Sequence, residues 1–136
     1  MNSESSTSPD GRGGDMLALG ARLLIAPIFV ISGASKLADP AGTIGYIGSV
    51  GLPLPEAGYA AAVAVELIGG LALLAGFRTR LAALVLALFS LAAALAFHFQ
   101  LGDQNQFIHF FKNLAMAGGL LQLAAFGAGR YSLDRR

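Results

Sequence analysis

The hydrophobic residues of this chain form four long runs that are separated by shorter, more polar stretches. The runs cover approximately residues 17–37, 57–77, 81–99 and 107–127. A helix needs about 20 apolar residues to cross a bilayer, so each run is long enough for one crossing. Backbone groups inside lipid must be paired, and short connections make successive helices antiparallel. The pattern therefore predicts an all-α, integral membrane four-helix up-down bundle.

The segments outside these runs differ in character. Residues 1–15, MNSESSTSPDGRGGD, are almost free of apolar side chains, which predicts a disordered N-terminal tail. Residues 16–130 form the predicted four-helix domain, and residues 131–136 form a short C-terminal tail. The first connection, PAGTIGYIGSVGLPLPE, is partly apolar. Its apolar residues recur every three positions, which favours a short interfacial helix across the outer mouth of the bundle.

The composition agrees with a membrane protein. The chain is 55% hydrophobic and 12% charged, which is about half the charged fraction of a soluble domain. A net charge of +1 gives no reason to expect a nucleic-acid partner. Cysteine is absent, which excludes thiol chemistry and the usual iron–sulfur ligands. Two histidines without cysteine are weak support for a metal site, so no metal is expected; His109 is expected to be solvated beside the third connection.

Basic residues predict the orientation. With four crossings, both termini and the second connection lie on one side of the membrane. The other side holds Lys36 and Lys112, whereas the terminal side holds seven arginines: Arg12, Arg22, Arg78, Arg80, Arg130, Arg135 and Arg136. Since cytoplasmic loops are enriched in Lys and Arg, both termini are predicted to be cytoplasmic.

Five ionisable residues lie within the predicted spans, and each is costly in lipid. Arg22 lies near the cytoplasmic end of the first span, where it is interpreted as an interface anchor that extends to the headgroups. The others are Lys36, Glu66, His98 and Lys112, and Lys112 is followed by Asn113.

Folding the spans into hairpins brings these polar residues together. His98 and Lys112 are equidistant in sequence from Asn105, so they are expected at similar depth near the outer surface. Lys36 ends the first span on the same side. Glu66 lies nine residues into the second span, about 13 Å deep at ~1.5 Å per residue. The outer half of the bundle is therefore predicted to hold a polar cluster.

Glu66 is too deep to extend easily to water. An unpaired carboxylate at that depth would be protonated or paired, and both Lys36 and Lys112 are candidate partners. The sequence leaves two interpretations open. The cluster is a structural ion pair that specifies helix pairing, or it also binds a ligand or handles a proton.

Several sequence stretches together resemble the DoxX family of small bacterial four-span membrane proteins. They are ARLLIAPIFVISGASKLADP, GLPLP, VELIGGLALLAGFRTR, FHF, FKNLAMAGGLL and GAGRYSLD, in that order. The resemblance implies a multi-pass protein of the bacterial cytoplasmic (inner) membrane, similar to the small subunit of thiosulfate:quinone oxidoreductase. It implies an oxidoreductase subunit as partner and a quinone as ligand. The chain has no cofactor motif of its own, so the resemblance indicates a non-catalytic or quinone-binding subunit.

Two classes of function follow from these expectations. In a redox subunit, Lys112 and Asn113 would donate hydrogen bonds to quinone carbonyls, and His98 or Glu66 would relay a proton. An apolar wall would come from Phe97, Phe99, Phe107, Phe110 and Phe111. The alternative is a small proton-coupled transporter or solute-binding membrane protein that uses Glu66 in a homo-oligomer. A membrane scaffold for a soluble partner is the third interpretation.

Overall fold

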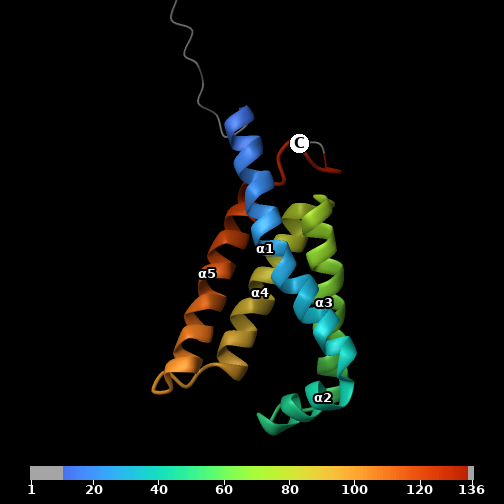
Figure 1. Ribbon diagram of the computed structural model, residues 1–136, viewed down its shortest axis with the longest axis vertical. Coiled ribbons are helices and arrows are strands. Elements are labelled where there is room, and N and C mark those ends of the chain that lie inside the picture. Colours follow the sequence, from blue (N-terminus) through green and yellow to red (C-terminus); the bar gives the residue numbers. More distant parts are fainter. Residues whose placement is uncertain (1–10, 135–136) are drawn as a thin grey trace, which may run out of the picture.

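The computed structural model describes residues 11–134, and within that range it contains five helices and no strand. The helices are α1 Arg12–Ala38, α2 Pro40–Ser49, α3 Pro55–Ala75, α4 Thr79–Phe97 and α5 Gln104–Phe126. The four long helices alternate in direction, and α2 lies across the lower end of the molecule (Figure 1). Both ends of the described chain lie at the opposite end. The predicted all-α class is confirmed.

The long helices pack in two pairs. α1 packs mainly against α3 and α4 against α5, while α3 and α4 join the pairs. The core between them consists of fully buried leucines and alanines, among them Leu73, Leu86 and Leu120. The small residues allow the helix backbones to approach closely, which stabilises helix pairs in lipid by van der Waals contact. A Cβ on Gly70 would lie 2.9 Å from Cγ2 of Val30, so α1 and α3 need glycine there.

Three of the helices, α1, α3 and α4, are long and apolar enough to cross a membrane. α5 has 23 residues but is more polar over its first half, where it carries two glutamines, two asparagines, a histidine and a lysine. Its length permits a crossing, whereas its composition does not by itself indicate one. The fourth predicted crossing stays a prediction.

The first helix begins earlier than the sequence predicts. Residues 1–10 of the predicted disordered tail lie outside the described residues, but Arg12 to Asp15 are helical, so the predicted boundary at residue 15 is wrong. The reason is a tertiary contact: Asp15 is 9% exposed, and its Oδ1 accepts a hydrogen bond of 3.0 Å from the backbone N–H of Arg130. This bond attaches the first turn of α1 to the C-terminal segment.

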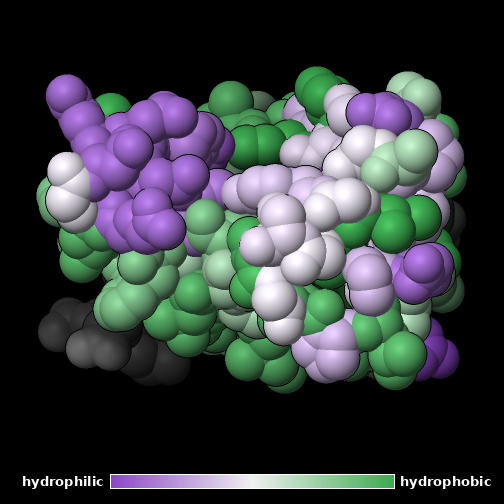
Figure 2. Space-filling view, turned by 90° about the horizontal axis from the view of Figure 1, so that it is seen from below, coloured by the Kyte–Doolittle hydropathy of each residue, from purple (hydrophilic) through white to green (hydrophobic). Residues whose placement is uncertain are grey.

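The predicted helix in the first connection is present as α2. Asp39 precedes it and accepts a hydrogen bond of 3.0 Å from the N–H of Gly42, and Pro40 occupies the first turn, where no backbone donor is needed. Seen from below, hydrophilic residues gather on the left over the α4–α5 connection, while the region of α2 is nearly neutral in hydropathy (Figure 2). The largest group of hydrophilic residues at the α2 end therefore lies over the α4–α5 connection (Figure 2).

Candidate functional site

A cavity of about 830 Å³ lies between the long helices at the α2 end, and all five helices line it. Most of its wall is apolar, with contributions from Ile28, Phe29, Phe89 and Met116. Its polar residues include all five predicted site residues: Lys36, Glu66, His98, Lys112 and Asn113. The five residues therefore lie around one cavity, although they do not form one contiguous hydrogen-bonded cluster.

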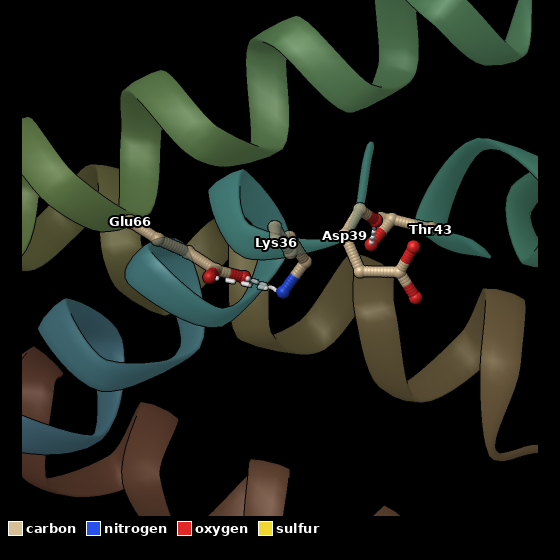
Figure 3. Close-up of polar contacts among 4 residues, drawn as sticks. All are labelled: Lys36, Asp39, Thr43 and Glu66. Carbon is tan, nitrogen blue, oxygen red and sulfur yellow. Dashed lines mark hydrogen bonds and ion pairs between the residues drawn. The ribbon is translucent and has the colours of Figure 1, made fainter. Parts of the chain in front are cut away.

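Lys36 and Glu66 form an ion pair between α1 and α3. The Lys36 Nζ donates to both carboxylate oxygens of Glu66, at 2.8 and 3.0 Å, and Glu66 is only 3% exposed. Figure 3 shows the two side chains pointing toward one another, while the Asp39 carboxylate points away. The sequence left Lys36 and Lys112 as candidate partners, and the structure selects Lys36. In a low-dielectric interior, each charge makes the other's burial tolerable.

Asn113 has a different environment. It lies on α5, is 8% exposed and lines the cavity. Among residues 11–134, its side-chain amide makes no hydrogen bond. The amide atoms are not fully enclosed by protein, so they are open to water or to a ligand in the cavity. Asn113 therefore presents both a donor and an acceptor to whatever occupies the cavity.

A further set of polar residues, which includes His98, His109 and Lys112, connects the end of α4 with the start of α5. His98 follows the last residue of α4, and its Nδ1 lies 2.8 Å from Oε1 of Gln106. Its ring stacks on His109 with 5.1 Å between ring centroids, and the Lys112 Nζ lies 3.2 Å from Nδ1 of His109. His109 lies on α5 and is partly exposed, and its contact with Lys112 is at the surface. The exposed Lys112 contacts His109 rather than Glu66.

Sequence reasoning missed the contribution of α2 to the cavity. Thr43 and Tyr46 of α2 line it, and the Tyr46 ring stacks on Phe97 of α4 with 5.3 Å between centroids. The helix itself was predicted, but the contact between Tyr46 and Phe97 leaves no local signal in the sequence. Ser90 also lines the cavity, and its position inside an apolar run was a visible signal. Of the five phenylalanines expected to form an apolar wall, only Phe97 lines the cavity.

Arg22 lies at the other end of the molecule and differs from its predicted role. It is 1% exposed, so it does not extend to the headgroups as an interface anchor would. Its Nη1 donates to the carbonyls of Leu73 at 3.3 Å and Leu74 at 3.0 Å, and its Nη2 donates to the carbonyl of Tyr131. The last carbonyls of α3 lack partners within the helix and carry the negative end of the helix dipole, which explains the inward orientation.

Within residues 11–134, no group of three or more His, Asp or Glu side chains is arranged to hold a metal ion. The stacked pair of His98 and His109 instead has hydrogen-bond partners on α5, Gln106 for His98 and Lys112 for His109.

Comparisons with known proteins agree with this architecture. The DoxX family model matches residues 17–99. The chain is 40% identical to the inner membrane protein YqjF of Escherichia coli K12 over 124 residues, which is 89% of this chain and 92% of that relative. It is 36% identical to the inner membrane protein YphA of the same organism over 126 residues, 89% of this chain and 90% of that relative. No solved structure matches. The chain therefore belongs to the DoxX family and is an integral protein of the inner membrane.

Proposed function

We propose that this protein is the membrane subunit of a quinone-linked redox system and that the cavity binds a quinone headgroup. The observation that carries the proposal is Asn113, whose side-chain amide makes no hydrogen bond among residues 11–134 and opens onto a largely apolar cavity of about 830 Å³. Small-molecule sites in proteins are mostly apolar cavities of this size with a few polar groups that fix orientation.

The hydrogen-bonding groups suit a quinone. Its two carbonyl oxygens only accept hydrogen bonds, and the cavity offers donors from the amide of Asn113 and the ammonium of Lys112. The Lys36 ammonium is a third donor, although it is held by Glu66. Apolar side chains such as Phe29, Phe89 and Met116 provide contacts for the ring and the isoprenoid chain.

Reduction of a quinone to a quinol consumes two electrons and two protons. This chain holds no redox motif in its sequence, so the electrons come from a partner oxidoreductase subunit, and the chain's residues position the headgroup and supply protons. Glu66 and His98 both line the cavity and both can carry a proton. Lys36 stabilises the deprotonated form of Glu66 after it gives up a proton.

The proposal includes four crossings with both termini in the cytoplasm. α5 runs antiparallel to α4 (Figure 1), and its 23 residues span about 35 Å at ~1.5 Å per residue, enough to cross the hydrocarbon core. Arginines gather at the end that holds the described termini, as the positive-inside rule requires of a cytoplasmic end. The cavity would then lie in the outer half of the membrane.

The test is retention of quinone on purification in mild detergent. We expect the wild-type protein to carry a bound quinone and Asn113→Ala to retain about fivefold less, the effect of one lost hydrogen bond. Gln122→Ala is the matched control, because Gln122 is also an amide on α5 but is exposed and outside the cavity wall. Equal quinone content in wild type and Asn113→Ala would refute the proposal.

A proton-coupled transporter is the second candidate. The observation that favours it is the buried Glu66 on the cavity wall, since deep carboxylates are common proton carriers in transporters. This function predicts proton-coupled flux in liposomes that is lost in Glu66→Gln. A protein that carries quinone and shows no such flux belongs to the redox class.

A further inference from the structure

A second hollow lies at the end of the molecule opposite α2, where α3 turns into α4. It has a volume of about 450 Å³ and shares no wall residue with the large cavity. One side is formed by Phe77 to Leu81, and the other by Phe126 to Ala128 together with Leu133 and Asp134. In Figure 1 this is the upper end, where the C-terminal segment passes over α3 and α4.

Two guanidinium groups line this hollow. The Nη1 of Arg80 donates to the carbonyl of Ala125 at 3.0 Å, which holds the side chain in place. Its guanidinium also lies close to Gly127, where a Cβ would be only 3.2 Å from Nε. Most of its five donors stay available. The exposed Arg78 side chain makes no hydrogen bond or ion pair among residues 11–134. Paired guanidinium groups are a common recognition element for phosphate.

The one acidic residue in the wall is already engaged. The Asp134 carboxylate accepts the backbone N–H of Arg78 at 2.7 Å and that of Thr79 at 2.9 Å, which caps the N-terminus of α4. The backbone N–H of Asp134 also donates to Gly76 O at 2.9 Å. These bonds fix the wall of the hollow, and the two arginines outweigh the single carboxylate, so the wall carries a net positive charge.

Large apolar side chains surround the arginines. Four residues that line the hollow are more than half exposed: Phe77, Leu81, Phe126 and Leu133. Such residues at the end of membrane-crossing helices lie at the boundary between acyl chains and headgroups. The hollow thus offers positive charge and apolar surface side by side, which is the complement of a phospholipid rather than of a small soluble anion.

We propose that this hollow binds one anionic phospholipid, with the phosphodiester between Arg78 and Arg80 and the acyl chains against Phe77, Leu81 and Phe126. The site depends on the chain being a membrane protein and not on the quinone proposal, because it lies at the other end of the molecule. It goes beyond a general attraction of basic residues to acidic lipid, since it assigns the contact to two particular arginines.

The experiment is native mass spectrometry of the full-length protein in mild detergent, titrated with phosphatidylglycerol or phosphatidylcholine. We expect a single phosphatidylglycerol adduct at concentrations where phosphatidylcholine gives little. Arg78→Gln and Arg80→Gln should each weaken that adduct about fivefold. Arg78→Gln removes no intramolecular hydrogen bond of the described residues, so its effect reports binding rather than misfolding.

Arg130→Gln is the matched control, because Arg130 is an exposed arginine near the same end that does not line the hollow. Equal weakening by Arg130→Gln would overturn the proposal in favour of diffuse electrostatic attraction. A second arm adds soluble glycerol phosphate as competitor. Displacement of the lipid by this competitor at equal concentration would overturn the lipid site in favour of a site for free phosphate. Equal binding of the two phospholipids would overturn the selectivity for anionic lipid.

Discussion

Single residues determine which charges can be buried in this protein. Glu66 is tolerated at 3% exposure because Lys36 contacts both of its oxygens. The sequence predicted a deep carboxylate with a lysine partner but could not choose between Lys36 and Lys112. Both lysines lie near the same end of the bundle, and the choice depends on the rotation of α1 and α5 about their axes, which single-residue spacing does not determine.

Removing only Lys36 should lower the free energy of unfolding more than removing both Lys36 and Glu66. Lys36→Met leaves the Glu66 carboxylate buried without its partner, and we expect the free energy of unfolding in detergent to fall by about 3 kcal/mol. The double variant Lys36→Met, Glu66→Leu removes both charges and should recover most of that loss. Denaturant titration of both variants measures the difference. If the double variant is less stable than the single one, the ion pair is not what makes the burial tolerable.

At the scale of helices, the close approach of α1 and α3 depends on glycines. Gly33 and Gly70 face side chains of the other helix, with hypothetical Cβ contacts of 2.7 Å to Leu67 Cγ and 2.9 Å to Val30 Cγ2. The four long apolar runs were visible in the sequence because their periodicity and length are local properties. The early start of α1 and the packing of α2 against α4 were not, because they depend on the contacts of Asp15 and Tyr46 with distant segments.

Two glycine-to-alanine substitutions on α3 and α5 separate the effect of helix packing on stability from the effect of helix propensity. Gly70→Ala should lower the free energy of unfolding by about 1–3 kcal/mol, because the new methyl group meets Val30 and the backbone of α1. Gly118→Ala is the control: nothing lies within 4 Å of its Cβ position, so it should be neutral or slightly stabilising. Thermal unfolding in detergent measures both. Equal effects would mean that the glycine on α3 is not a packing requirement.

At the scale of the whole molecule, the two ends have different chemistry. The α2 end holds the large cavity with its ion pair and unpaired amide, whereas the other end holds the arginines and the C-terminal segment. The gathering of polar residues at the α2 end was predictable because hairpin folding fixes relative depth. The inward orientation of Arg22 was not, because it depends on the carbonyls of Leu73 and Leu74 and on the path of the C-terminal residues.

The proposed topology of four crossings with both termini in the cytoplasm can be tested with single cysteines, because the chain has none of its own. A single Asn105→Cys substitution, in the first turn of α5, should react in intact cells with a membrane-impermeant maleimide. Arg130→Cys should react only after the inner membrane is opened. Both positions are exposed, so burial does not limit labelling. Labelling of both positions from the same side would contradict a crossing by α5.

The central claim is that the cavity beside Asn113 binds a quinone, and photolabelling with an azidoquinone tests it most directly. The protein in native membranes is irradiated, digested and analysed by mass spectrometry, with excess unlabelled quinone as competitor. We expect labelling of the cavity-lining segments, Ser32–Lys36 of α1 and Asn113–Met116 of α5, and we expect excess unlabelled quinone to reduce it. Labelling that falls on the lipid-facing residues of α5, such as Leu121 and Gln122, or that excess quinone does not reduce, would contradict it.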